Sequence, residues 1–340
     1  MDMKEAIKKV VAGENLSIDE AKDVMRLMLS GEATQAQIGG FLTALRIKGE
    51  TIDEIVGCAT VMQELAEHVK PKTAIPYIDF VGTGGDGANT FNISTTSAFV
   101  AAGAGVPIAK HGNRAISSKS GAADVLEALG INIMLEAEKV EACIEKVGMG
   151  FMFAQIFNKA MKNVGKARSD MGIRTIFNIL GPVSNPSNAK GALIGVYSNR
   201  LTEPLAKAMH AMGVERGIIA CGKGCMDEIT VAGPTQISEI KNNEVITYEI
   251  KPEDFGIKTA SVEDIRGGDC EENAKIARAV LRGEKGPKRD IVLLNAGAAI
   301  YVAGIAESIA EGIKKAEQSI DRGAAMKVLE DLIEISKTFK

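Results

Sequence analysis

The sequence Ile75-Pro-Tyr-Ile-Asp-Phe-Val81 leads into Gly82-Thr-Gly-Gly-Asp-Gly87, and Asn92-Ile-Ser-Thr95 follows shortly afterwards. The first stretch predicts a short buried strand, and Ser97 to Gly103 suits a helix. Four glycines in six residues leave backbone N–H groups uncovered, so this glycine loop (residues 82–87) can pass close to an anion. A strand, a glycine-rich loop and a helix in this order are typical of α/β proteins that bind phosphate groups.

The rest of the chain continues this alternation. Strands are predicted at Val106–Ala109, Leu193–Tyr197 and Gly217–Cys221, helices at Asp124–Leu129 and Glu203–Met212, and a meander around Glu239–Ile250. The apolar run from Ile291 to Ala306 predicts a buried strand that continues into a helix. We therefore expect an α/β fold, in which a small all-helical domain accompanies a larger α/β domain with a mostly parallel central sheet and surrounding helices.

The first seventy residues predict the helical domain. Three segments have the capping-box form, in which a Ser or Thr and a Glu or Gln three residues later satisfy the first N–H groups of a helix: Ser17–Glu20, Thr34–Gln37 and Thr51–Glu54. Helices are expected at Ala21–Leu29, Ile38–Ile47 and Ile55–Val69, with Gly31 and Gly49 as stops, and His68 and His210 fall within predicted helices.

The predicted domains are residues 1–70, with a contribution from about 158–186, and residues 71–157 together with 187–340. The second unit is the α/β domain, and the cleft between the two units is the expected ligand site.

Composition excludes several classes of protein. A net charge of −4 and a pI near 5.7 argue against a general nucleic-acid binder. No secretory signal is visible, and the longest apolar run is shorter than a membrane span, so we expect no membrane association and a cytoplasmic location. Five scattered cysteines suit reduced thiols, and Cys221-Gly-Lys-Gly-Cys225 does not have zinc-site spacing.

The glycine loop also matches the dinucleotide motif Gly-x-Gly-x-x-Gly. That motif requires an acidic residue about 20 positions later, at the end of the next strand. Here the next strand ends in a polar loop that runs from Lys110 to Gly121, which contains cations and hydroxyls in place of the carboxylate. Because successive loops of a parallel sheet lie at the same edge, this basic loop and the glycine loop together predict a site for several phosphates.

Two further groups of residues complete the predicted site. Asp227 and Glu228 follow a strand, and with the hydroxyl of Ser94 they could hold Mg²⁺ beside the phosphates. Arg168 could hold a carboxylate through two hydrogen bonds, although the sequence alone supports Arg174 equally. No Ser–His–Asp or Cys–His set surrounds His111.

These residues resemble a known family. The glycine loop, Asn92–Thr95, Lys110–Ser118, Asp227-Glu228, Ala33–Glu50 and Gly172–Pro186 are together similar to the anthranilate phosphoribosyltransferases of tryptophan biosynthesis. The resemblance implies a type III phosphoribosyltransferase fold and a homodimer joined through the helical domain. It also implies 5-phosphoribosyl-1-pyrophosphate as donor, anthranilate as acceptor and Mg²⁺ as cofactor.

The resemblance further implies a role for individual residues. Ser94, Asp227 and Glu228 would bind magnesium, Asn113 and Arg168 would contact the acceptor, and Lys110 would stabilise the leaving group together with the N–H donors. The donor and its surroundings would be bound by Gly82, Gly85, Asp86, Thr90, Asn92, Ile93, Ser94, Thr95, Lys110, His111, Gly112, Asn113, Arg114, Ala115, Ile116, Ser117, Ser118 and Ala122.

One segment departs from the family pattern. Many members have a His-Pro pair where this chain has Asn158-Lys159, and Gly165-Lys166 replaces a usual Ala-Pro. A different aromatic amine or base is therefore the alternative acceptor. Phosphorolysis of a nucleoside, an NAD-dependent oxidoreductase and a non-catalytic relative are the remaining alternatives. An aromatic amine is nucleophilic when neutral, so catalysis by positioning and leaving-group stabilisation needs no strong base.

Overall fold

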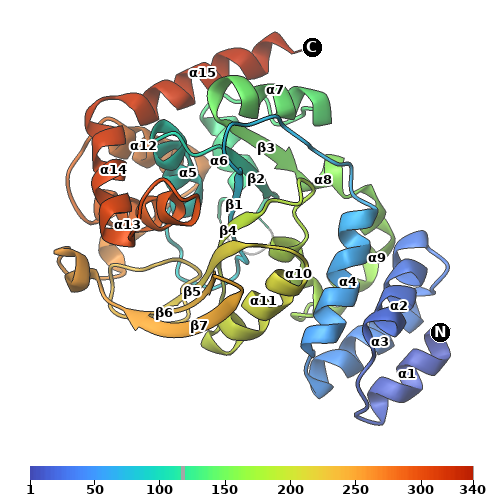
Figure 1. The fold of residues 1–340 in the computed structure, drawn as a ribbon. Coiled ribbons are helices and arrows are strands. Elements are labelled where there is room, and N and C mark those ends of the chain that lie inside the picture. Colours follow the sequence, from blue (N-terminus) through green and yellow to red (C-terminus); the bar gives the residue numbers. More distant parts are fainter. Residues whose placement is uncertain (116–118, 340) are drawn as a thin grey trace.

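A seven-stranded sheet forms the centre of the molecule in the computed structural model, which describes residues 1–115 and 119–339 (Figure 1). The strand order across the sheet is β3-β2-β1-β4-β5-β6-β7. The strands are β1 (Ile78–Gly82), β2 (Ile108–Gly112), β3 (Met149–Phe153), β4 (Gly191–Gly195), β5 (Arg216–Gly222), β6 (Thr235–Lys241) and β7 (Glu244–Ile250).

The sheet is mostly parallel, which confirms the expected fold class. Strands β1 to β5 pair in parallel, whereas β5–β6 and β6–β7 pair antiparallel. The predicted meander is the hairpin of β6 and β7. Its turn residues Asn242 and Asn243 have φ angles of 52° and 64°, a left-handed conformation that asparagine tolerates better than most residues.

The chain reverses its direction of travel across the sheet between β1 and β4. From β1 it moves outward through β2 to β3, and it then returns to place β4 on the opposite side of β1. Loops that leave two neighbouring strands in opposite directions open a crevice at their carboxyl ends, where open α/β sheets bind ligands. The glycine loop leaves β1 at this point.

Helices cover both faces of the sheet (Figure 1). Helices α5 and α13 contact β1, with α12, α14 and α15 packed around them, and α11 contacts β5 and β6 from the other face. Alternate residues of β4 accordingly belong to different hydrophobic cores, Leu193 to one and Ala192 and Ile194 to the other. The helices are α5 (Ile93–Gly103), α6 (Ala122–Ala128), α7 (Ala137–Val147), α8 (Ala154–Phe157), α10 (Phe177–Val183), α11 (Asn199–Ala211), α12 (Cys270–Leu281), α13 (Pro287–Val302), α14 (Ile309–Asp321) and α15 (Ala324–Thr338), with 3₁₀ turns at Lys159–Met161, Pro252–Phe255 and Glu263–Ile265.

A bundle of N-terminal helices stands beside the sheet, coloured blue in Figure 1. It contains α1 (Met3–Val11), α2 (Ile18–Ser30), α3 (Gln35–Lys48) and α4 (Ile52–Glu64), and α9 (Lys162–Met171) packs against α2 and α3. The three expected capping boxes are confirmed at Ser17, Thr34 and Thr51. Gly31 and Gly49 end α2 and α3, as predicted.

Two expectations were wrong. Residues 291–302 form no strand but belong to α13, because this helix is buried on all sides and its uniform apolarity imitates a strand. Helix α4 ends at Glu64, so His68 lies outside it and its Nδ1 is 3.3 Å from the carbonyl oxygen of Pro186. Among the described residues, no helix is long and apolar enough to cross a membrane.

Candidate active site

The glycine loop owes its shape to residues without side chains. Gly84, Gly85 and Gly87 have φ angles of 70°, 74° and 77°, a region in which L-residues with a Cβ are strained. Thr83 N donates to Gly195 O at 2.9 Å, so the loop begins as a continuation of the β1–β4 pairing. The loop leaves β1 at the point where the strand order reverses.

Asp227 occupies the space that two other glycines leave free. A Cβ on Gly82 would lie 2.5 Å from Asp227 Oδ2, and a Cβ on Gly195 would lie 1.5 Å from the Asp227 carbonyl oxygen. The carboxylate therefore enters between the ends of β1 and β4, where Gly84 N donates to Asp227 Oδ2 at 2.6 Å. Gly195 is a site residue that the sequence pattern did not indicate, and only the packing of the acidic loop reveals it.

Glu228 caps the helix that follows the glycine loop. Its Oε1 accepts from Ser94 N, in the first turn of α5, at 3.0 Å. The Asn92 side chain makes no capping bond. It contacts Ser120 Oγ at 3.1 Å and Asn273 Nδ2 at 2.9 Å instead. The two carboxylates thus already occupy N–H groups of the kind that a phosphate would use.

The carboxylates at this edge repel one another. Burial raises the pKa of Asp227 to about 7, with repulsion from Asp86 as the next cause. Burial, followed by the charge of Asp227, raises the pKa of Glu228 well above its usual range. In the described part of the chain no three His, Cys, Asp or Glu side chains form a ready-made metal cage. Mg²⁺ does not need one, since it takes one or two carboxylates and completes its shell with water and phosphate oxygens.

The Lys110 side chain lies near Ser94 and is attracted by Asp227 and Glu228. Its ammonium group is buried, donates to Phe80 O at 2.5 Å and lies 3.4 Å from Ser94 Oγ. Burial lowers the pKa of Lys110 to about 8, although the charges of Asp79, Glu228 and Asp227 act in the opposite direction. This lysine therefore places a positive charge near the carboxylates of Asp227 and Glu228.

His111 forms a buried ion pair with Asp79, a residue that the sequence pattern did not single out. The distance from His111 Nδ1 to Asp79 Oδ2 is 2.9 Å, and His111 Nε2 lies 2.8 Å from Gly181 O. Burial lowers the pKa of His111, but attraction and hydrogen bonding to Asp79 outweigh it and the pKa is raised. A carboxylate in the middle of a predicted buried strand was the available signal, because a buried charge requires a partner.

The basic loop from Lys110 to Gly121, the second loop of the site, is described only in part. Ile116, Ser117 and Ser118 lie outside the described residues. Asn113 is exposed, and the guanidinium of Arg114 pairs with Glu127 and, at 3.1 Å, with Asp124. Asp124 Oδ2 also accepts from Ala115 N and Gly121 N, both at 2.9 Å, which ties the loop to the start of α6 near Ala122. Gly112 ends β2 directly before this loop.

Several other predicted site residues lie around the start of α5. Ile93 and Thr95 are buried, so only their backbone could meet a ligand. Thr90 forms a β-bridge with Arg266, and Asp86 Oδ1 accepts from Ala88 N at 3.0 Å. Their proposed roles remain predictions.

The two candidate arginines have different surroundings. Arg168, in α9, lies 5.1 Å from the ring of Phe177, and burial lowers its pKa. Arg174, in the turn between α9 and α10, lies 4.2 Å from the ring of Tyr197, and its Nη2 donates to the carbonyl oxygen of Gly85. Of the two, Arg174 is the one with a direct contact to the glycine loop.

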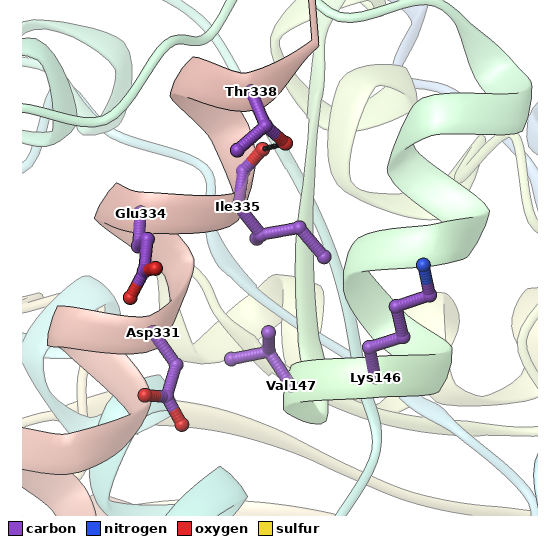
Figure 2. Close-up of a pocket in the computed structure, with 6 residues that line it drawn as sticks. All are labelled: Lys146, Val147, Asp331, Glu334, Ile335 and Thr338. Atoms are coloured by element: carbon purple, nitrogen blue, oxygen red, sulfur yellow. Dashed lines mark hydrogen bonds between the residues drawn. The ribbon is translucent and has the colours of Figure 1, made fainter.

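A separate hollow of about 280 Å³ lies between α7 and α15. Figure 2 shows Asp331 and Glu334 on α15, with the Lys146 side chain extending away from them. Val147 is the last residue of α7, and only Gly148 separates it from the first residue of β3, so this hollow is at the amino edge of the sheet. Gly82 and Gly112, among the predicted site residues, end β1 and β2 and so lie at the carboxyl edge, where open α/β sheets bind ligands.

Two family models match the chain. One describes the a/b domain of a glycosyl transferase family and matches residues 74–326, and the other describes the helical bundle domain of that family and matches residues 4–66. The anthranilate phosphoribosyltransferase of Acetivibrio thermocellus is 56% identical, over 99% of this chain and 97% of that protein. The same enzyme from Clostridium kluyveri is 50% identical, over 97% of this chain and 98% of that protein.

Solved structures give the same result. Anthranilate phosphoribosyltransferase from Thermus thermophilus superposes with a TM-score of 0.93 at 41% identity, over 98% of this chain and 99% of that one. The Saccharomyces cerevisiae enzyme in complex with PRPP and Mg has a TM-score of 0.91 at 30% identity, over 99% and 98% of the two chains. The yeast enzyme is also known in complex with 4-fluoroanthranilate.

Proposed function

This chain belongs to the anthranilate phosphoribosyltransferase family, and we propose that it joins the 5-phosphoribosyl group of 5-phosphoribosyl-1-pyrophosphate to the amine of anthranilate. The products are N-(5-phosphoribosyl)anthranilate and pyrophosphate, in tryptophan biosynthesis. The observation that carries the proposal is a glycine loop with left-handed φ angles that lies against two buried carboxylates. Both are at the point where the strand order of the sheet reverses. A polyanionic donor with a bound cation matches both halves of that site.

The donor binds between the glycine loop and the second loop in this proposal. The N–H groups of residues 85–87 bind its pyrophosphate, since Thr83 N and Gly84 N are already bonded to Gly195 and Asp227, and Lys110 adds positive charge beside Ser94. Negative charge grows on the pyrophosphate as its bond to ribose C1 breaks. Donors that are already oriented stabilise this charge without reorganising, which lowers the barrier.

Magnesium fits the acidic residues. Asp227 and Glu228 are buried carboxylates with raised pKa values, and Ser94 Oγ lies beside Lys110. A divalent cation would relieve their repulsion, and we propose these three residues as its ligands. When bound with the donor, Mg²⁺ neutralises the charge of the pyrophosphate.

Arg168 and Asn113 are the proposed contacts of the acceptor, Arg168 through the anthranilate carboxylate. A guanidinium in a half-buried place attracts a carboxylate strongly, because burial weakens the competition from water. In place of the usual His-Pro pair, Lys159 is bound to Glu67 at 3.2 Å, on the surface. The relatives favour anthranilate over the alternative of another aromatic amine.

The decisive experiment follows the loss of anthranilate fluorescence with donor and Mg²⁺ present. We expect turnover by the wild-type protein and a loss of about 100-fold or more in Asp227→Asn, a scale typical of removing one preorganised electrostatic contact. Glu215→Gln is the matched control, since this exposed carboxylate lies at the amino edge of the sheet next to β5. Tight donor binding without turnover would contradict the acceptor, and full activity of Asp227→Asn would contradict the metal site.

A homodimer joined through the helical domain is part of the proposal. Val11 and Ile47, in α1 and α3, are 69% and 82% exposed, and α1 and α3 pack against each other. Large apolar side chains that face water on one bundle support an interface there. A cytoplasmic location agrees with the five cysteines, all of them free thiols.

A further inference from the structure

Arg174 connects two parts of the molecule that the sequence separates widely. It follows α9, which packs on the helical bundle, and its guanidinium reaches the glycine loop after β1. The contact is specific, because Nη2 donates to the carbonyl oxygen of Gly85 while the guanidinium carbon lies 4.2 Å from the Tyr197 ring centroid. Stacking on an aromatic ring holds a guanidinium in one plane and directs its N–H groups.

Charge pairing does not explain this position. In the described ranges no carboxylate lies within ion-pair distance of Arg174, although Arg114 and Arg289 each have such partners. Arg174 is also exposed, so it was free to extend into water. The protein instead directs it to a backbone oxygen of the loop.

The glycine loop is held at two consecutive residues. Gly84 N donates to Asp227 Oδ2 at 2.6 Å, and Gly85 O accepts from Arg174. Gly84 and Gly85 have no side chains that could anchor the loop, and glycine has the largest conformational freedom to lose. Asp227 is also a proposed magnesium ligand, so its bond to Gly84 competes with the metal, whereas the Arg174 contact does not.

The held oxygen fixes the direction of an N–H group. Gly85 C=O and Asp86 N–H belong to one planar trans peptide and point in opposite directions. Binding the oxygen to Arg174 therefore aims the Asp86 N–H away from Arg174. The positive charge of the Arg174 guanidinium beside the carbonyl also polarises the peptide and strengthens its N–H as a donor.

We propose that Arg174 is a positioning residue for the donor: it holds the Gly85–Asp86 peptide so that its N–H faces the pyrophosphate. This inference rests on the proposed function, and it gives Arg168 and Arg174 different roles. Arg168 serves the acceptor, whereas Arg174 acts on the donor through the glycine loop.

The test compares Arg174→Gln and Arg174→Lys with the wild-type protein. For Arg174→Gln we expect the KM for 5-phosphoribosyl-1-pyrophosphate to rise about 10-fold or more, the scale of one hydrogen bond from a charged donor. The KM for anthranilate should change by less than about 2-fold. Arg174→Lys keeps a charged donor without the planar fork, so it should recover part of the loss. Arg322→Gln, an exposed arginine at the end of α14, is the matched control.

Calorimetric titration of the donor with Mg²⁺ makes the inference independent of the acceptor. If the wild-type protein binds donor but does not convert anthranilate, the proposed acceptor fails while the Arg174 comparison still holds. An unchanged donor affinity in both variants would overturn the inference. So would a rise confined to the anthranilate KM, which would place Arg174 on the acceptor. Melting curves show whether Arg174→Gln is folded, and Arg174→Lys carries the test if it is not.

Discussion

The pair of Asp79 and His111 shows how one buried residue sets the properties of another. Asp79 is 2% exposed and His111 is 6% exposed, so water does little to solvate either charge. His111 Nδ1 lies 2.9 Å from Asp79 Oδ2 and 3.2 Å from Asn185 Nδ2, and His111 Nε2 lies 2.8 Å from Gly181 O. The strands β1 and β2 are thereby linked to α10, the helix that follows the interdomain turn.

Replacing Asp79 should reverse the direction of the His111 shift. In the wild-type protein we expect His111 to titrate above its ordinary value of 6.5, and in Asp79→Asn below it, since burial then acts without the opposing carboxylate. Proton NMR of the imidazoles measures both, with His68 and His210, the other histidines of the chain, as internal references. Equal His111 titrations in the two proteins would contradict the ion pair.

The same pair should make stability depend on pH. The folded pKa of His111 lies above its unfolded value, so its contribution is complete below about pH 6.5 and is lost as pH rises through the folded pKa. Lys110 acts in the opposite direction on the stability of the wild-type protein, because burial outweighs the attraction of Asp79 and lowers its pKa to about 8, but this effect lies above about pH 8. The difference in unfolding free energy between wild type and Asp79→Asn should therefore shrink as pH rises from 6, and urea titrations would measure it.

At the scale of single elements, the ends of two strands require glycine. Strands β1 and β4 end at Gly82 and Gly195, which together admit Asp227. Glycine is not required at these two positions for a turn or a left-handed φ angle, since neither residue has a positive φ. The strand ends are bare because another loop lies against them.

Gly195→Ala should disturb the acidic loop. The new Cβ would lie 1.5 Å from Asp227 O, a distance that no side-chain rotation can relieve. We expect a loss of about 1–3 kcal/mol in unfolding free energy, typical of overpacking, and weaker Mg²⁺ dependence of turnover. Urea unfolding and magnesium titration measure the two effects.

Gly165→Ala is the matched control for that variant. Gly165 lies inside α9 and has no positive φ, and apart from the adjoining backbone of the helix nothing lies within 4 Å of the place that a Cβ would take there. Alanine at this position should raise the unfolding free energy by about 0.5–1 kcal/mol, because glycine is the poorer helix former. If Gly195→Ala were equally harmless, the close approach of Asp227 would be wrong.

At the scale of the whole molecule, the helical bundle is joined to the α/β domain through a shared hydrophobic core. Its apolar core continues into one face of the sheet, since Ile194 and Ile219 belong to the same cluster as Met25 and Phe41. The bundle is therefore anchored to the α/β domain, while α1 and α3 leave Val11 and Ile47 in water. These two side chains mark the surface that we propose as the dimer interface.

Ile47→Glu should weaken that dimer. A charge at a buried interface position costs several kcal/mol unless it is paired, so the monomer fraction should rise. Sedimentation velocity at several protein concentrations would measure the change. Ile246→Glu is the control, because Ile246 is 54% exposed on β7, away from the bundle. An unchanged sedimentation coefficient for Ile47→Glu would place the interface elsewhere or contradict the dimer.

Some features of this protein were predictable from sequence because they depend on residues a few positions apart. The capping boxes at Ser17, Thr34 and Thr51 satisfy N–H groups within one helical turn, and Gly31 and Gly49 end helices through their own φ angles. The glycine loop and its neighbouring polar loop likewise indicate a phosphate site before any packing is known. Local hydrogen bonding and steric freedom are enough to specify these elements.

Other features were decided only when distant segments packed together. The strand order that places β4 beside β1, the pairing of Asp79 with His111 and the reach of Arg174 to Gly85 all join segments that no local pattern relates. Helix α13 shows the same limit, since burial on every side removes the periodicity that distinguishes a helix from a strand. Sequence therefore predicted the elements that depend on local patterns and a site for several phosphates, and tertiary structure decided which side chains meet, because those contacts depend on long-range packing.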